Sequence, residues 1–338
     1  MHLNTQGNNA AQKHKWMAAG KSFGCLLVLW LTTISCSSAV ATPPTQGQTQ
    51  SIKAAEPLLQ AKITDLAGEK IEYAALRVAN PRATLVFENG LMLDLQTWEA
   101  VAQGLNHCCN LLFYNRPGVG HSESEQEVLS PALSAARLQQ LLQQQKLTPP
   151  YVLIGHSLGG QYAQVFTKRY PEQVDALLLV DALPLGLVKP ATDFPWYTRT
   201  GLWLFAPQAT RQEIANINDM GRYLLQEPQP FNKPMIRLVT QTATPQPKSA
   251  GLVKNLLNGV IYAEDFGVWA LDPAAAEQRM NDIYPQAEVR TLVANHRVQE
   301  QMPGVVVDAI FRLLEQRRQA MAANAAQPSA QLQKPAVQ

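Results

Sequence analysis

A serine framed by glycines, lying between a strand-like run and a helix-like run, is the feature that most constrains how this chain folds. The segment Gly155–Gly160 reads Gly-His-Ser-Leu-Gly-Gly and directly follows the apolar run Tyr151–Ile154. A sharp strand-to-helix turn needs small residues at Gly155 and Gly159, because side chains there would collide with the flanking elements. Short motifs of this kind also occur in ordinary turns, so the context carries the prediction that Ser157 is a nucleophile at a sheet edge.

Short apolar runs alternate with helix-like segments along most of the chain. A hairpin is predicted at 59–78, and buried strands are predicted at 83–88, 110–114, 151–155, 176–180, 235–240 and 289–293. Helices are predicted at 95–105, 131–145, 161–170, 273–283 and 305–317. This alternation is typical of an α/β fold with a mostly parallel central sheet flanked by helices.

The alternation stops after Asp181, where a stretch rich in Trp, Pro and Leu begins. An insertion there, after the sixth strand, would lie over the carboxyl edge of the sheet, where open parallel sheets bind ligands. We therefore predict a lid at about 184–231. Its large apolar residues favour an apolar group in the pocket, although such residues more often form the core of a lid. They are Phe194, Trp196, Tyr197, Leu202, Trp203, Leu204 and Phe205.

The composition excludes several classes of function. Hydrophobic residues make up 46% of the chain and charged residues 16%, a balance that can build one sizeable core. The net charge is +2, and lysines cluster only near the N-terminus, so a nucleic-acid partner is not expected. No residues have the spacing of metal ligands, and neither a metal nor an organic cofactor is expected.

The two ends of the chain differ in composition from its middle. Basic residues at 13–21, an apolar run at 23–34 and small residues ending at Ala41 follow the order of a secretory signal peptide. The apolar run is shorter than the roughly 20 residues that span a bilayer, which favours cleavage over an uncleaved anchor. We predict a signal peptide at 1–41 in a periplasmic or secreted protein, a flexible linker at 42–56, one folded domain at 57–318 and a disordered tail at 319–338.

The four cysteines do not imply a disulfide framework. Cys36 lies in a segment that resembles a bacterial lipoprotein box, and its lipidation, or an uncleaved N-terminus, would attach the protein to a membrane. Removal of residues 1–41 would leave only Cys108 and Cys109. Because adjacent strand residues point to opposite faces, we expect one buried and one partly exposed thiol rather than a strained disulfide. The sequence does not indicate the oligomeric state.

Two further segments carry a resemblance to a known family. Glu88–Leu91 looks like the His-Gly loop of the α/β-hydrolases, and Asn115–Ser122 looks like their Asp-x-x-G-x-G-x-S loop. The resemblance runs from about residue 59 to 317 and implies an esterase-like or lipase-like serine hydrolase of the α/β-hydrolase fold. The sequence departs from the family pattern at Asn89, where His is usual, and at Asn115, where Asp is usual.

Two backbone N–H groups are candidates for an oxyanion hole. The N–H of Leu158 lies at the predicted helix N-terminus after the nucleophile, where helical N–H groups lack partners. The family resemblance implies the N–H of Leu91 as the second donor, with Met92 as the alternative.

The candidate general base is His296. In the α/β-hydrolase order the triad runs serine, acid, histidine, and His296 is the one histidine that follows Ser157. It lies after a predicted strand and before the final helix. A surface histidine is the alternative role for it, and His121 is the rival base, whereas His156 and His107 are discounted.

The acid of the triad is the least constrained by the sequence. The family most often carries it after the strand predicted at 235–240, and the residues that follow, up to Pro245, contain no carboxylate. A known variation puts the acid one strand earlier, and Asp181 ends that strand at the correct sheet edge. We therefore favour Asp181, with Asp265 and Asp272 as competitors and a structural capping role as the alternative for Asp181.

These residues together predict a serine hydrolase that needs no cofactor and cleaves a small or medium apolar carboxylic ester through an acyl-enzyme. An amidase, a peptidase or a lactonase would share the same fold and triad. Haloalkane and epoxide hydrolases of similar fold attack with Asp, so Ser157 argues against both. A non-catalytic binding protein of the same fold is the alternative from a different class, and the missing acid after Thr240 supports it.

Overall fold

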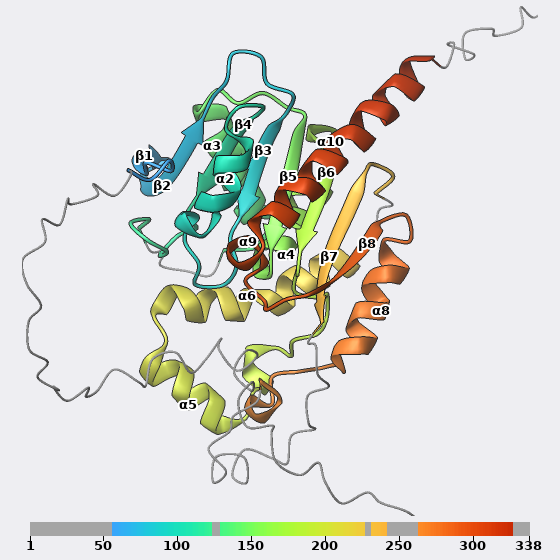
Figure 1. The fold of residues 1–338 in the computed structure, drawn as a ribbon. Helices are drawn as coiled ribbons and strands as arrows, with labels where there is room; N and C mark the ends of the chain where they lie inside the picture. Colours follow the sequence, from blue (N-terminus) through green and yellow to red (C-terminus); the bar gives the residue numbers. More distant parts are fainter. Residues whose placement is uncertain (1–55, 124–128, 227–230, 242–262, 327–338) are drawn as a thin grey trace, which may run out of the picture.

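The computed structural model describes residues 56–123, 129–226, 231–241 and 263–326. Their strands form one eight-stranded sheet in the order β1-β2-β4-β3-β5-β6-β7-β8 (Figure 1). The antiparallel strands at one edge are β1 (Lys62–Leu66) and β2 (Glu69–Leu76). The remaining strands run parallel to one another: β3 (Thr84–Glu88), β4 (Asn110–Tyr114), β5 (Tyr151–His156), β6 (Val174–Val180), β7 (Met235–Gln241) and β8 (Glu288–Val293). The predicted α/β-hydrolase fold, with a mostly parallel sheet, is confirmed.

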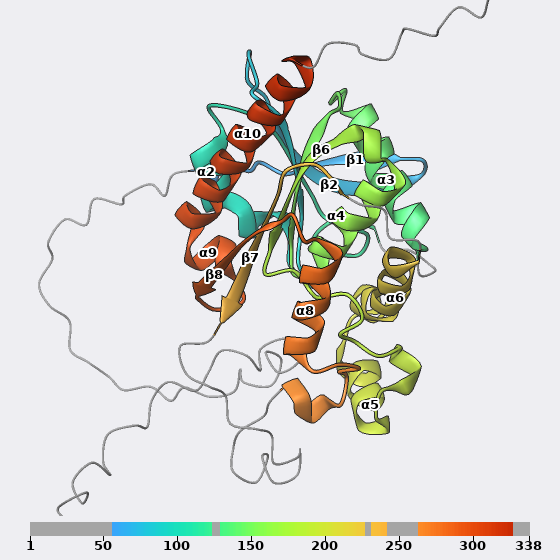
Figure 2. The same ribbon diagram turned by 90° about the vertical axis from the view of Figure 1, so that its right-hand side faces the viewer.

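Helices cover both faces of the sheet (Figure 2). One face packs against α3 (Pro131–Gln144) and α4 (Leu158–Arg169), and the other packs against α2 (Glu99–Leu105) and α10 (Pro303–Ala326). The alternation of side chains along β3 divides its residues between the two cores, because Val86 joins the first while Leu85 and Phe87 join the second. Burial on both faces is why the central strands are continuous apolar runs in the sequence.

Two helix boundaries differ from the sequence prediction by three residues or more. Helix α4 begins at Leu158, directly after the serine, rather than at 161. Helix α10 continues to Ala326, so residues 319–326 are helical although the tail was predicted to be disordered from 319. The residues from 319 to 326 are mostly Ala, Gln and Met, which favour a helix without needing a core to pack against.

The chain between β6 and β7 crosses the carboxyl end of the sheet (Figures 1 and 2). It contains η3 (Ala191–Asp193), α5 (Trp196–Phe205) and α6 (Gln208–Leu225). Helix α6 packs on the core through its apolar face, which includes Ile217 and Met220. On α5, by contrast, Leu202 is buried whereas Trp196, Trp203, Leu204 and Phe205 are exposed. This is the segment for which the sequence predicts a lid.

Both cysteines of the folded domain are free and buried, so the expectation that one thiol is partly exposed is wrong. Strand β4 begins at Asn110, after Cys108 and Cys109, and the side-chain alternation of a strand therefore does not apply to them. The Sγ of Cys108 instead donates to the carbonyl of Leu105 at 3.3 Å.

The predicted signal peptide at 1–41, the site of lipidation at Cys36 and all but the last residue of the predicted linker at 42–56 lie outside the described residues. Among the helices of the described ranges, none has the length and apolar character needed to span a bilayer.

Candidate active site

Ser157 occupies the turn between β5 and α4 in a backbone conformation that disfavours residues with side chains. Its φ is 51° and its ψ is −121°. The turn closes only because the residues two positions before and two positions after the serine are glycines. A Cβ at Gly155 would lie 2.6 Å from the carbonyl oxygen of Gly159, and one at Gly159 would lie 2.3 Å from that of Glu88. The strained turn thus lifts the serine hydroxyl out of the strand at the carboxyl edge of the sheet.

Three side chains from distant parts of the chain meet at this edge. His296, in the loop after β8, brings Nε2 to 2.8 Å from Ser157 Oγ. Its Nδ1 lies 2.5 Å from Oδ2 of Asp181, the residue that follows β6. The structure therefore brings Ser157, His296 and Asp181 together in one hydrogen-bonded chain.

Asp181 is held in place by the strand that most often carries the acid in this family. The N–H of Thr240, in β7, donates to Asp181 Oδ1 at 2.9 Å, and its hydroxyl donates to Oδ2 at 2.8 Å. The N–H of Asp181 donates in turn to the carbonyl of Leu238 at 2.7 Å. Strand β7 thus supplies the hydrogen-bond donors for a carboxylate that comes from β6.

The charge of Asp181 decides which nitrogen of His296 carries the proton. Burial by itself raises the pKa of Asp181, but the hydrogen bonds from His296 and Thr240 outweigh burial and hold that pKa below its usual value. An ionised carboxylate only accepts, so His296 donates from Nδ1. The lone pair of Nε2 is then directed at the hydroxyl of Ser157.

His156, which precedes the serine, holds the loop of His296. Its Nε2 lies 2.7 Å from the carbonyl oxygen of His296, and its Nδ1 lies 3.3 Å from Nε2 of Gln299. Burial and the nearby charge of His296 lower the pKa of His156 to about 3. It therefore stays neutral near pH 7 and donates its Nε2 proton to the backbone of His296.

Acid should destabilise the protein through His156. Its pKa is about 6.5 in the unfolded chain but lower in the folded one, so protonation below pH 6.5 favours unfolding. This contribution to stability is complete above pH 6.5 and is lost as the pH falls towards 3. Between pH 7.5 and 5 the loss should be about 2 kcal/mol. We expect chemical denaturation to show that the free energy of unfolding falls less between pH 7.5 and 5 in His156→Gln than in the wild type. In the exposed control, His107→Gln, it should fall as much as in the wild type.

The two predicted oxyanion donors lie in segments that approach each other. Leu158 is the first residue of α4, where an N–H has no acceptor within the helix. The close approach of Gly159 to the carbonyls of Glu88 and Asn89 brings the end of β3, and hence the segment leading to Leu91, against the elbow. The alternative, Met92, has a φ of 59° and an exposed side chain.

The competing candidates for the acid, Asp265 and Asp272, and for the base, His121, make contacts elsewhere. Asp272 caps α8 (Pro273–Ile283), accepting from the N–H of Ala274 at 2.9 Å. Asp265 is buried in η4 (Ala263–Phe266), and its carbonyl accepts from the hydroxyl of Tyr197 at 3.0 Å. The exposed His121 pairs with Glu72 at 2.8 Å. Within the described residues, no three His, Cys, Asp or Glu side chains are grouped so as to hold a metal ion.

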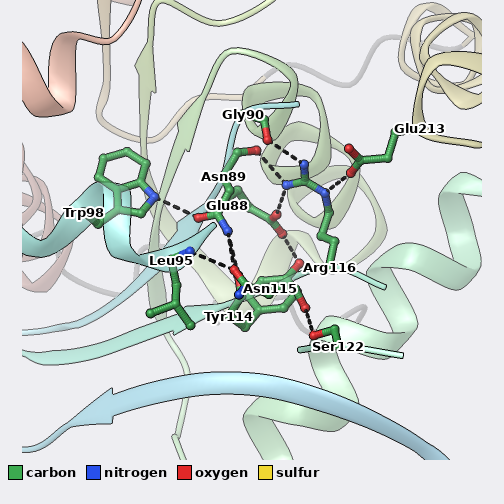
Figure 3. A network of polar contacts seen from close by, with 10 residues as sticks. All are labelled: Glu88, Asn89, Gly90, Leu95, Trp98, Tyr114, Asn115, Arg116, Ser122 and Glu213. Atoms are coloured by element: carbon green, nitrogen blue, oxygen red, sulfur yellow. Dashed lines mark hydrogen bonds and ion pairs between the residues drawn. The ribbon is translucent and has the colours of Figure 1, made fainter. Parts of the chain in front are cut away.

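The two loops that depart from the family pattern form a buried polar network (Figure 3). Asn115 accepts from the N–H of Leu95 at 2.7 Å and donates to Glu72 at 2.7 Å. Asn89 accepts from the indole N–H of Trp98 at 2.9 Å and donates to the carbonyl of Tyr114. A carboxylate from β2, that of Glu72, thus lies beside position 115, where the family usually has Asp.

A family model described as "Alpha/beta hydrolase family" matches residues 85–309, which include the elbow, Asp181 and His296. The chain belongs to the alpha/beta hydrolase family. Solved structures of the same fold include carboxylesterase CesB from Bacillus subtilis, with 14% identity over 76% of this chain and 91% of that one, at a TM-score of 0.53. A membrane phospholipase A is 18% identical, with 77% of this chain and 87% of that one covered, at a TM-score of 0.54.

Curated relatives match shorter parts of this chain. The pimeloyl-[acyl-carrier protein] methyl ester esterase of Hamiltonella defensa is 29% identical over 29% of this chain and 36% of its own length. An uncharacterized protein of Schizosaccharomyces pombe is 32% identical over 24% of this chain and 15% of its own length. The chain therefore spans well under half of the length of these relatives.

Sequence reasoning missed a second group of buried charges beside the elbow. Arg116, directly after Asn115, lies between Glu88 at the end of β3 and Glu213 in α6. Glu88 and Arg116 both lie in the segments that resemble the family's motifs, but the resemblance gives neither residue a partner. The signal in the sequence was a carboxylate, Glu88, directly after the apolar run Leu85–Phe87, since a buried carboxylate needs a cationic or hydrogen-bonding partner.

Proposed function

We propose that this hydrolase cleaves a carboxylic ester through an acyl-enzyme, with Ser157 as nucleophile, His296 as general base and Asp181 as the carboxylate that orients His296. The observation that carries the proposal is the continuous hydrogen-bonded chain from Asp181 Oδ2 through the imidazole to Ser157 Oγ. Acyl transfer needs this arrangement, in which a base lies within reach of the nucleophile and is itself oriented by a third group.

The first half of the reaction forms the acyl-enzyme. His296 Nε2 takes the proton of Ser157 Oγ while Oγ attacks the carbonyl carbon of the ester. The electron pair of the carbonyl bond moves to its oxygen, where the N–H groups of Leu158 and Leu91 stabilise the negative charge. Asp181 stabilises the positive imidazole without taking its proton. As the tetrahedral intermediate collapses, the alcohol leaves with the proton from His296.

The second half of the reaction restores the serine. A water molecule gives a proton to His296 Nε2 and attacks the acyl carbon, and the same N–H groups stabilise the second oxyanion. The carbon–Oγ bond then breaks, Oγ takes the proton back from His296, and the carboxylic acid leaves.

The substrate we propose is a small or medium apolar ester, with α5 and α6 as the lid over its pocket. Both helices lie at the carboxyl edge of the sheet, and α5 carries several large apolar side chains. Two of the similar proteins have names that specify esterases, one of them for a methyl ester. A solved epoxide hydrolase shares the fold at a TM-score of 0.51, but the serine at the elbow favours acyl transfer.

A fluorophosphonate probe and a series of p-nitrophenyl esters test this function in the folded wild-type protein. We expect one label per chain, localised to Ser157 by peptide mass spectrometry, and the highest kcat/KM for acyl chains of intermediate length. Amide and lactone substrates pass through the same tetrahedral intermediate, so both belong in the screen. If the folded protein neither labels nor hydrolyses any of them, the ester-hydrolase proposal is wrong and the binding-protein alternative gains support.

A further inference from the structure

Arg116 is hydrogen-bonded to the backbone of the loop after β3, which carries the proposed oxyanion donor Leu91. Its Nη1 donates to the carbonyl of Asn89 at 2.6 Å, and its Nη2 donates to the carbonyl of Gly90 at 3.0 Å (Figure 3). Both of these successive carbonyls therefore point at one guanidinium group.

The direction of these carbonyls determines the direction of the N–H groups that follow them. In a trans peptide unit the C=O and the N–H point to opposite sides. The carbonyl of Gly90 shares its peptide unit with the N–H of Leu91, so this N–H points away from Arg116. On another side of the loop, a Cβ at Gly90 would lie 2.8 Å from Nδ1 of His156, next to the serine. Arg116, together with the N–H of Leu93, which donates to the same carbonyl of Gly90 at 3.3 Å, thus holds the orientation of the Leu91 N–H beside the elbow.

The guanidinium group is in turn fixed by α6. Its Nε donates to Oε1 of Glu213 at 2.5 Å, and the two side chains are only 5% and 8% exposed. Below the guanidinium lies the ring of Tyr162, with 4.5 Å between Cζ and the ring centroid. Tyr162 belongs to α4, the helix that begins directly after Ser157. The orientation of the loop therefore depends on contacts made by both α4 and α6.

The charges around Arg116 make the pair with Glu213 the stronger of its two ion pairs. Glu88 lies farther away, with Oε2 3.5 Å from Nη1, and its other oxygen accepts from the hydroxyl of Tyr114 at 2.6 Å. Burial raises the pKa of Glu88 to about 7 despite the positive charge of Arg116. A buried cation without a close carboxylate is costly, so Glu213 is the partner that keeps Arg116 in place.

We propose that Arg116 is a positioning residue, which orients the Leu91 N–H for the oxyanion and links this orientation to the docking of α6 through Glu213. This inference rests on the proposed ester hydrolysis. The planar fork of arginine explains the choice of residue, since it reaches two carbonyls and a carboxylate together, whereas a lysine has one nitrogen with which to reach all three.

The test compares Arg116→Lys and Glu213→Gln with the wild type in ester hydrolysis and in inhibition by a trifluoromethyl ketone, which forms a tetrahedral oxyanion adduct with the serine. Complete loss of an oxyanion donor costs about 10²–10³ in kcat. For Arg116→Lys we expect kcat to fall by about 10- to 100-fold at nearly unchanged KM, with ketone affinity falling in parallel. Glu213→Gln should change both quantities in the same direction by a smaller factor.

Arg317→Lys is the matched control. Like Arg116, Arg317 binds both carboxylate and backbone carbonyl oxygens, in its case one of each, from Asp175 and Arg82. Asp175 lies near the start of β6, at the opposite end of the sheet. Its replacement should leave kcat and ketone affinity unchanged. Circular dichroism and thermal denaturation establish that each variant is folded.

Two results would overturn the inference. One is a folded Arg116→Lys with wild-type kcat and ketone affinity, and the other is a loss confined to KM. Should Arg116→Lys fail to fold, Glu213→Gln decides alone, and wild-type kinetics in that variant would contradict the link to α6. A wild type that neither labels nor hydrolyses esters is a different failure, because it refutes the proposed function on which this inference rests.

Discussion

Replacement of Ser157 by alanine should lower kcat for an ester by about 10⁶-fold and abolish labelling by a fluorophosphonate. In triads that act as a unit, loss of the nucleophile costs about as much as loss of all three members. His296 Nε2, 2.8 Å from Ser157 Oγ, would have no hydroxyl to activate. The double variant Ser157→Ala with His296→Ala should therefore be no slower than Ser157→Ala alone.

The control for this experiment is Ser134→Ala, because Ser134 lies on α3 and its hydroxyl donates to the carbonyl of Ser130 at 3.1 Å. Its labelling and kcat should equal those of the wild type. Residual labelling of Ser157→Ala at wild-type rate would show that another residue is the nucleophile. Losses in the two single variants that multiply in the double variant would contradict a triad that acts as a unit.

Replacement of Asp181 by asparagine should lower kcat by about 10⁴-fold while leaving KM nearly unchanged. The carboxylate now accepts from His296 Nδ1 and from both donors of Thr240. An amide supplies one oxygen and one donor nitrogen, so it cannot accept from all of them. It would favour the tautomer that places the proton on Nε2, and His296 could then no longer take the proton of Ser157. The measurement is steady-state ester hydrolysis, supported by the rate of fluorophosphonate labelling.

Asp272→Asn and Asp265→Asn make the same chemical change at the two competing carboxylates. Asp272 caps α8 through the N–H groups of Ala274 and Ala275, and asparagine caps helices about as well, so both activity and stability should be unchanged. Asp265→Asn, at a buried position, should affect stability more than kcat. A loss of 10⁴-fold in either control, with an active Asp181→Asn, would assign the acid to the other residue.

The residues that local sequence rules identified are those whose role depends on their immediate neighbours. The strained turn at Ser157 requires Gly155 and Gly159, because the backbone of the following helix and of the end of β3 leaves no room for a Cβ at either position. This requirement leaves a readable pattern over a few residues. The sequence also identified His296, but in a different way. The order of the triad along the chain left it as the one histidine after the serine.

The candidate acid could not be identified in this way. Its identity depended on which carboxylate reaches the imidazole of His296, and Asp181 lies 115 residues before that histidine. Nothing near Asp181 in the sequence distinguishes a triad acid from a residue that caps a loop. The distinction comes from the neighbouring strand, where Thr240 supplies two hydrogen bonds, and from the loop of His296. Both contacts exist only once β6, β7 and β8 lie side by side.

By itself the sequence determined the order of strands and helices and the elbow at Ser157, because hydrophobic periodicity and turn chemistry act over short stretches of chain. It favoured His296 through the order of the triad in the family that it resembles. The tertiary structure alone decided the position of Asp181 against His296 and the contact of Arg116 with Glu213, 97 residues apart. The pairing of two buried charges depends on the distance between them and on their burial in the folded chain, and the residues next to either charge in the sequence determine neither quantity.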